Sequence, residues 1–143
     1  MNLVIDASVL IKFYVPEVLS DRAERLLASV EKGDIDLLAP DLIYPEAGNI
    51  LWEKQRLKEL TRSEVEEITN AILSLSLKIE ASRTLLPLAV EVAITYGVTV
   101  YDASYLSLAK VYETTLITAD RKIFNVLAKT DLNDSILWLG SYK

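Results

Sequence analysis

The chain of 143 residues contains no cysteine and no histidine. Without cysteine it can form no disulfide, no thiolate nucleophile, no iron–sulfur cluster and no thiolate zinc site. Without histidine it cannot use a histidine-containing triad, a histidine general base or the usual zinc and copper ligands. A metal ion bound by this chain must therefore be held by oxygen atoms, which favours Mg²⁺ or Mn²⁺.

Long apolar runs and excess positive charge are also missing. No run approaches the roughly 18 apolar residues of a membrane span, and the N-terminal segment meets Asp6 without the basic and apolar regions of a signal peptide. We therefore expect a cytoplasmic protein without a membrane partner. The net charge is −6, from 15 Lys and Arg against 21 Asp and Glu. This argues against broad electrostatic binding of nucleic acid, but local basic patches and metal-bridged phosphates remain compatible with it.

The residues that are present are those of a folded globular protein. Apolar residues make up 51% of the chain, with only four glycines and four prolines. The composition is even from end to end, with no repeat, low-complexity tract or linker, and the length corresponds to one domain. We expect a single domain over residues 1–143.

Short β-rich runs alternate with helical patterns along the chain. Strands are expected at residues 2–6, 36–39, 98–101, 115–118 and 135–139, and the ambiguous run 77–80 is a further candidate. Helices are expected at residues 7–14, 21–32, 41–57, 61–75, 85–96, 103–112 and 121–129, with Ser20 and a Thr61–Glu64 capping box as starts. Strands separated by helices predict an α/β layer fold with a parallel sheet.

Three of the expected strands run directly into an aspartate, namely Asp6, Asp102 and Asp120. The carboxyl ends of parallel strands meet at one edge of the sheet, where open α/β folds bind their ligands. The three carboxylates would then converge. Each aspartate also precedes an expected helix, and Asp is a favoured N-cap, so helix capping is an alternative explanation for each one.

Glu46 has no such explanation. It lies three residues after Ile43 and four before Ile50, inside the apolar stripe of its helix. Burying an ionised carboxylate costs several kcal/mol unless a cation or hydrogen bonds compensate. Glu46 is therefore a candidate member of the acidic site; the alternative is a helix-edge glutamate that pairs with Lys54 or Lys12.

Two hydroxyl groups accompany the acids. Ser8 follows Asp6 by two residues, and Thr118 precedes Asp120 by two. A hydroxyl can orient a carboxylate or a metal-bound water, although either residue could equally serve as a local cap or a strand residue.

Four segments carry these acids in order along the chain: VIDASVL (4–10), PEAGNIL (45–51), YDASYLSLA (101–109) and LITADRKIF (116–124). Together they resemble the motifs of the PIN-domain nucleases, above all the VapC-type toxins of toxin–antitoxin pairs. Each motif alone is loose, but four in the same order over nearly the whole chain are a specific signal. One departure is the absence of glycine from residues 113–115, before the last core strand of the motif.

The resemblance implies a fold and an activity. The fold would be a three-layer PIN-like α/β fold, with a central, mainly parallel sheet of about five strands flanked by helices. The activity would be Mg²⁺- or Mn²⁺-dependent hydrolysis of single-stranded RNA, leaving 5′-phosphate and 3′-hydroxyl ends. The metal ligands would be Asp6, Glu46, Asp102 and Asp120, with Ser8 and Thr118 as orienting groups in the catalytic site.

The resemblance also implies partners: an RNA substrate, a cognate antitoxin and a second copy of the chain in a homodimer. Lys12, Arg121 and Lys122 lie near enough to the acids in sequence to contact RNA phosphates. A second basic cluster, Lys54 to Lys58, could do the same or form an ordinary solvated face.

Two other classes of protein with an aspartate after the first strand need acids that this chain lacks. A haloacid-dehalogenase-type phosphatase needs a second acid two residues after the first, where this chain has Ser8, and receiver domains need an acidic pair that is also absent. A housekeeping PIN nuclease in RNA processing and a catalytically silent PIN-like binding module are closer alternatives.

Overall fold

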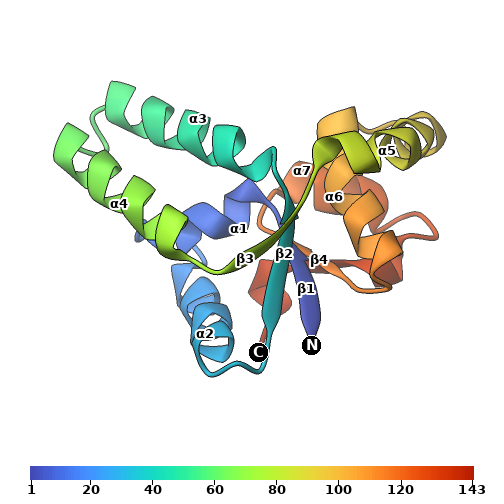
Figure 1. Cartoon of the computed structure of the whole chain (residues 1–143), viewed down its shortest axis with the longest axis horizontal. Helices are drawn as coiled ribbons and strands as arrows, with labels where there is room; N and C mark the ends of the chain where they lie inside the picture. Colours follow the sequence, from blue (N-terminus) through green and yellow to red (C-terminus); the bar gives the residue numbers. More distant parts are fainter.

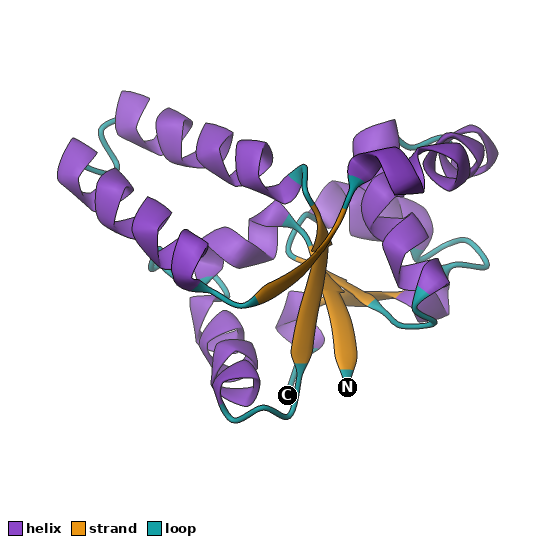
Figure 2. Ribbon diagram, in the orientation of Figure 1, coloured by secondary structure: helices purple, strands orange, loops and turns teal.

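A five-stranded parallel sheet forms the centre of the computed structural model, which describes residues 1–143 (Figures 1 and 2). The strands are β1 (Asn2–Ile5), β2 (Asp36–Pro40), β3 (Leu77–Glu80), β4 (Leu116–Thr118) and β5 (Ile136–Trp138). Their order is β3-β2-β1-β4-β5, and every neighbouring pair is parallel. The predicted α/β fold with a parallel sheet is therefore confirmed, and the ambiguous run 77–80 is a strand at the edge.

Helices cover both sides of this sheet. They are α1 (Ala7–Lys12), α2 (Ser20–Glu31), α3 (Ile43–Arg56), α4 (Arg62–Ser74), α5 (Ser82–Tyr96), α6 (Val100–Val111) and α7 (Arg121–Leu127), with short 3₁₀ turns at Asn133–Ser135 and Leu139–Ser141. In Figure 1, α1 to α4 lie on one side of the strands and α5 and α6 on the other. No single helix has the length and apolar content of a bilayer span; only α5 and α6 together reach it, and the chain bends by 112° between them.

Local sequence signals account for most of these elements. The run Leu3-Val4-Ile5 is buried on both faces because β1 is the central strand. At α4 the predicted capping box is present: the Thr61 amide donates to the Glu64 carboxylate at 2.9 Å, and the Glu64 amide donates to the Thr61 hydroxyl at 3.1 Å. Gly97 ends α5 with φ of 67°, a conformation that glycine adopts without strain.

The expected strand over residues 98–101 is wrong. Thr99 is instead the N-cap of α6, with its hydroxyl accepting a hydrogen bond from the Asp102 amide at 3.1 Å. The β-propensity of Val98, Val100 and Tyr101 is a weak preference that packing overrides. Here the helix is buried on all sides over the seven consecutive residues Ala103 to Ala109, which pack in the core. Asp102 therefore reaches the site from the first turn of a helix and not from the end of a strand.

Other differences are shifts of element boundaries. Ser20 is the first residue of α2 and not its cap; Leu19 takes that position with φ of 71°, and the Ser20 hydroxyl donates back to the Glu17 carbonyl at 2.8 Å. Helix α1 ends at Lys12 instead of Tyr14, and α5 begins at Ser82 instead of Leu85. Helix ends are hard to place from sequence because their terminal turns are held by few hydrogen bonds.

The strand order determines where a site can form. From β1 the chain winds outward through β2 to β3, whereas β4 and β5 lie on the opposite side of β1. The winding direction thus reverses between β1 and β4, and open α/β sheets place their binding crevice at the carboxyl end of such a point. In Figure 1 this is the upper end of the sheet, opposite both termini, where the first turns of α3 and α6 approach from either side.

Candidate active site

Asp6 is the first residue after β1, and its carboxylate is held at both oxygens. Oδ1 accepts hydrogen bonds from the Ser8 hydroxyl at 2.5 Å and from the Val9 amide at 3.2 Å. Oδ2 accepts one from the Thr118 hydroxyl at 2.5 Å. The amide contact also makes Asp6 the N-cap of α1, so the capping explanation is correct for this residue without excluding a second role.

The two hydroxyl groups link the ends of β1 and β4. Besides donating to Asp6, the Ser8 hydroxyl accepts from the Ala119 amide at 3.0 Å, and the Thr118 hydroxyl accepts from the Asp120 amide at 3.0 Å. Thr118 is fully buried. Both hydroxyls therefore orient the Asp6 carboxylate, although Thr118 lies nearer to Asp120 in sequence.

Asp102 and Asp120 reach the same region from two different helices. The exposed Asp120 is the N-cap of α7, with its carboxylate accepting from the Lys122 amide at 2.9 Å. Asp102 is the third residue of α6, whose cap is Thr99. The capping explanation therefore holds for Asp120 and fails for Asp102.

Glu46 lies in the first turn of α3 and is half-buried. Its Oε1 accepts a hydrogen bond from the Tyr105 hydroxyl of α6 at 2.8 Å. The pairing of Glu46 with Lys54 or Lys12 does not occur, because both ammonium groups contact Glu17 instead, each at 2.9 Å. Sequence reasoning missed Tyr105; its position three residues after Asp102, on the same face of a helix, is the signal that could have identified it.

The pKa shifts of the acids show that their carboxylates are close enough to interact. Burial raises the pKa of Asp6 to about 6, with a further contribution from the charge of Asp120. Burial also raises the pKa of Glu46, helped by the charges of Asp102 and Asp6. For Asp102, burial and then the Asp120 charge raise the pKa. Each of these four acids thus interacts with two of the others, and the structure brings them together at the carboxyl end of the sheet.

The chemistry of this donor set fits a divalent cation. The four acids are all carboxylates, the ligands that Mg²⁺ and Mn²⁺ prefer, and a bound cation would relieve their mutual repulsion. As the side chains stand, no three of them are arranged to hold one ion together. Direct ligation of one ion by all four carboxylates would therefore require side-chain rotation. Ligation through water molecules between the ion and the carboxylates would not require it.

The basic residues expected to contact RNA are mostly engaged elsewhere. The Lys12 ammonium is paired with Glu17, and only 14% of its side chain is exposed. The Arg121 guanidinium stacks on the Trp138 ring, 3.9 Å from its centroid. Lys122, exposed in the first turn of α7, follows Asp120 by two residues. Of the three, Lys122 is the side chain that makes no ion pair or aromatic contact.

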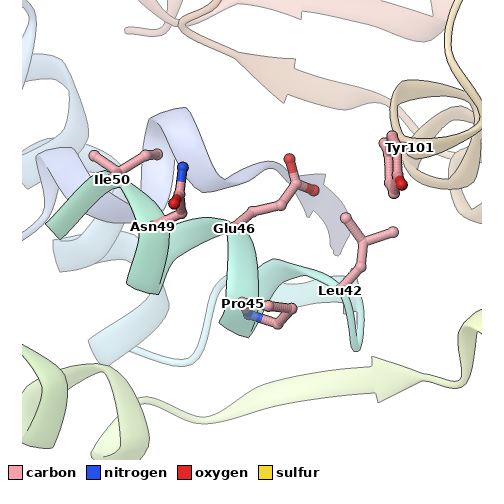
Figure 3. A pocket seen from close by; sticks show the side chains of 6 residues that line it. All are labelled: Leu42, Pro45, Glu46, Asn49, Ile50 and Tyr101. Atoms are coloured by element: carbon pink, nitrogen blue, oxygen red, sulfur yellow. The ribbon is translucent and has the colours of Figure 1, made fainter. Parts of the chain in front are cut away.

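A groove of about 540 Å³ opens beside the acids, between α3 and α6 (Figure 3). The Glu46 carboxylate extends from α3 toward Tyr101 of α6 across this groove. The lining residues are Leu42, Pro45, Glu46, Asn49, Ile50 and Tyr101. Because Glu46 belongs to both, the groove is continuous with the acidic site.

The chain is similar to known proteins over most of its length. The PIN domain family model matches residues 3–129. Ribonuclease VapC3 of Pyrobaculum aerophilum is 34% identical over 125 residues, which are 86% of this chain and 92% of that protein. The crystal structure of PAE2754 from the same organism superposes with a TM-score of 0.70 and 28% identity, covering 99% of this chain and 85% of that one.

A more distant structure has the same fold. VapBC2 of Rickettsia felis, bound to a DNA fragment from its promoter, aligns with a TM-score of 0.66 at 14% identity, over 96% of this chain and 98% of that one. Together with the family model and the sequence match, these similarities show that the chain belongs to the PIN-domain family and is a relative of VapC ribonucleases.

Proposed function

We propose that this protein is a metal-dependent endoribonuclease that cuts single-stranded RNA and acts in the cytoplasm as the toxin of a VapBC-type toxin–antitoxin pair. The observation that carries the proposal is the cluster of Asp6, Glu46, Asp102 and Asp120, in which each carboxylate interacts with two others. The similarity to Ribonuclease VapC3 supports the substrate class.

In this mechanism Asp6, Glu46 and Asp102 would hold one or two Mg²⁺ or Mn²⁺ ions, directly or through water, and Asp120 would complete the acidic pocket. A bound ion would lower the pKa of an attacking water and offset the charge on the phosphate oxygens. Ser8 and Thr118 keep the Asp6 carboxylate in one orientation through their hydrogen bonds. Tyr105 does the same for Glu46.

The reaction is hydrolysis of a phosphodiester bond. The water oxygen bonds to phosphorus as the bond from phosphorus to the 3′-oxygen breaks, and that oxygen takes up a proton. The products are a 3′-hydroxyl and a 5′-phosphate end. The carboxylates provide no attraction for the RNA itself, so the cation and local basic groups such as Lys122 must offset phosphate charge.

The proposed partners are a cognate antitoxin and a second copy of this chain. The fold shared with a VapBC complex supports an antitoxin, which would lay a helix or extended arm near the site and place a basic side chain among the acids. Exposed apolar side chains on the α3–α4 pair, including Trp52 and Leu73, provide a surface for self-association.

The test uses purified protein and an end-labelled single-stranded RNA. We expect cutting in Mg²⁺ or Mn²⁺, loss of cutting in EDTA, recovery when metal is restored, and no cutting by Asp6→Asn. Cutting that persists in EDTA or in Asp6→Asn would contradict the metal-dependent mechanism. A folded protein that cuts no RNA in either metal would point to the silent binding module instead.

A further inference from the structure

We infer that the groove beside Glu46 binds a nucleobase of the RNA next to the cleaved phosphate, with Tyr101 as the surface on which that base stacks. This inference rests on the proposed function, because it assigns a subsite to the same active site. Three observations support the subsite: Tyr101 is exposed, the groove has an apolar lining with few polar groups, and the groove shares Glu46 with the acidic site.

Tyr101 is an aromatic side chain without a structural role. It is the second residue of α6, directly before Asp102, and 68% of it is exposed. Four other tyrosine hydroxyls donate hydrogen bonds within the chain, for example that of Tyr105 to Glu46, whereas the Tyr101 hydroxyl makes none. An exposed ring that neither packs in the core nor forms a hydrogen bond is suited to stack on a ligand.

The opposite wall of the groove comes from α3. Leu42, Pro45 and Ile50 supply apolar contact, and the Glu46 carboxylate reaches toward Tyr101 (Figure 3). The volume of about 540 Å³ lies within the range of clefts that hold small planar ligands. A base seated here would be adjacent to the acids, so its phosphate would lie at the cation.

Asn49 supplies a polar group for reading the base. It follows Glu46 by three residues on α3, so the two side chains lie on the same side of the helix. Its amide offers one acceptor and two donors, a set that can pair with the edge of an unstacked base. Stacking on Tyr101 tolerates any base, whereas the contact with Asn49 would discriminate among them.

The charge of the lining favours a base over a phosphate. No lysine or arginine lines the groove, and its one ionisable acid is Glu46. A phosphate would be repelled there, while an uncharged aromatic base would not be. The sugar–phosphate chain would thus lie at the acids, where a bound cation would offset its charge, and the base would lie in the groove.

The experiment is a double-mutant cycle between Tyr101 and the base. Wild type, Tyr101→Ala and Tyr101→Phe are compared on a single-stranded RNA and on versions with one abasic nucleotide at each position flanking the cut. We expect Tyr101→Ala to lower kcat/KM about tenfold or more on intact RNA and Tyr101→Phe to retain it. When the abasic nucleotide is the one whose base would stack on Tyr101, the kcat/KM of the wild type should fall by the same factor. The kcat/KM of Tyr101→Ala should fall little further on that RNA.

Tyr112→Ala is the matched control. Tyr112 lies just beyond the other end of α6, is 44% exposed, and is distant from the acids. We expect the Tyr112→Ala variant to cut intact RNA as fast as wild type does. Asn49→Ala should leave stacking intact and change which base is preferred at the coupled position.

Each other outcome overturns the inference. If wild type cuts RNA and Tyr101→Ala cuts it equally well, the subsite is wrong while the proposed function stands. If Tyr101→Ala alters antitoxin binding or oligomer size without coupling to any base, the groove belongs to a protein partner. A wild-type protein that cuts no RNA overturns the proposed function and the subsite together.

Discussion

The Tyr105 hydroxyl donates a 2.8 Å hydrogen bond to the Glu46 carboxylate, joining residues 59 positions apart in the sequence. Tyr105 is 2% exposed, and burial together with the charge of Glu46 raises the pKa of the phenol far above its ordinary value. The hydroxyl thus stays protonated at neutral pH and remains a donor to Glu46. This bond ties α6, which carries Asp102, to α3, which carries Glu46.

We therefore expect Tyr105→Phe to weaken the metal site more than the fold. The substitution keeps the ring and should lower the free energy of unfolding by about 1 kcal/mol. Because Glu46 loses its orienting donor, the Mg²⁺ concentration for half-maximal cleavage should rise severalfold and kcat should fall about tenfold. Tyr96→Phe is the control, since the Tyr96 hydroxyl donates to Asp131 at 2.8 Å on the exposed surface. An unchanged Mg²⁺ response in Tyr105→Phe would contradict this role.

Asp102→Asn tests whether the acids form a metal site. Asp102 does not cap its helix, so the change removes charge without removing a cap. Relief of the repulsion of Asp102 by Asp120 and Glu46 should stabilise the metal-free protein by on the order of 1 kcal/mol. Loss of the favourable interaction of the Asp102 charge with the helix dipole should offset about 0.5 kcal/mol of this gain. Added Mg²⁺ should raise the Tm of the variant less than that of wild type, and cleavage should fall by orders of magnitude.

The control for this change is Asp21→Asn, because Asp21 also lies in the first turn of a helix but far from the acids. Asp21→Asn should lose the helix-dipole contribution and a partly exposed ion pair with Arg22 at 3.7 Å. It should keep the full Mg²⁺ response and cleavage. If Asp102→Asn matches Asp21→Asn in metal-free stability, in the rise of Tm with Mg²⁺ and in cleavage rate, Asp102 is not part of a metal site.

The raised pKa of Asp6 predicts a pH dependence of stability. Its pKa is about 6 in the folded protein and 3.8 unfolded. Between these values the folded state binds more protons than the unfolded state, so the metal-free protein should lose stability as pH rises from about 4 to about 6. The shift corresponds to on the order of 3 kcal/mol. Urea unfolding in EDTA should show this fall in the free energy of unfolding with rising pH in wild type, and a smaller fall in Asp6→Asn. Equal falls in the two proteins would contradict the assignment of the pH dependence to Asp6.

Added Mg²⁺ should act in the opposite direction. A cation binds ionised carboxylates, so its stabilising effect should be largest above pH 6 and small near pH 4. Calorimetric melts at the two pH values, with and without Mg²⁺, measure this difference. A Mg²⁺ effect that does not change with pH would mean that the ion binds elsewhere.

Glu17 holds α1 and α3 together through Lys12 and Lys54. Burial alone would raise the pKa of Glu17, but the hydrogen bonds and charges of the two lysines hold it below its ordinary value. The resulting stabilisation is present above the unfolded pKa of 4.5 and is lost as pH falls through the folded pKa. Glu17→Gln should therefore lower the free energy of unfolding at pH 7 by about 1–3 kcal/mol, because two largely buried ammonium groups lose their partner.

The exposed pair of Lys78 and Asp36 provides the comparison. Its side chains are 60% and 54% exposed, so Asp36→Asn should change the free energy of unfolding by less than about 0.5 kcal/mol. Equal effects of Glu17→Gln and Asp36→Asn in urea titrations would show that the Glu17 pairs are no stronger than surface pairs.

Local sequence was enough to place much of this site. An apolar run that ends in aspartate marks the end of a buried strand, and Asp6 and Asp120 lie where that pattern puts them. The spacing of Ile43, Glu46 and Ile50 predicted an acid on the inward part of a helix, and Glu46 is half-buried there. These signals are readable because strand and helix periodicity depend on neighbours within a few residues.

Other features depended on tertiary structure. Residues 98–101 have β-forming side chains, but Thr99 caps a helix whose following residues fill the core, and that packing decides their conformation. The partners of Lys54 and Tyr105 were equally hidden: Glu17 pairs with the lysine from before α2, and Glu46 reaches the tyrosine from another helix. Such contacts join groups that only the order of strands in the sheet brings together, and that order depends on the burial of the whole apolar core and not on any local run of residues.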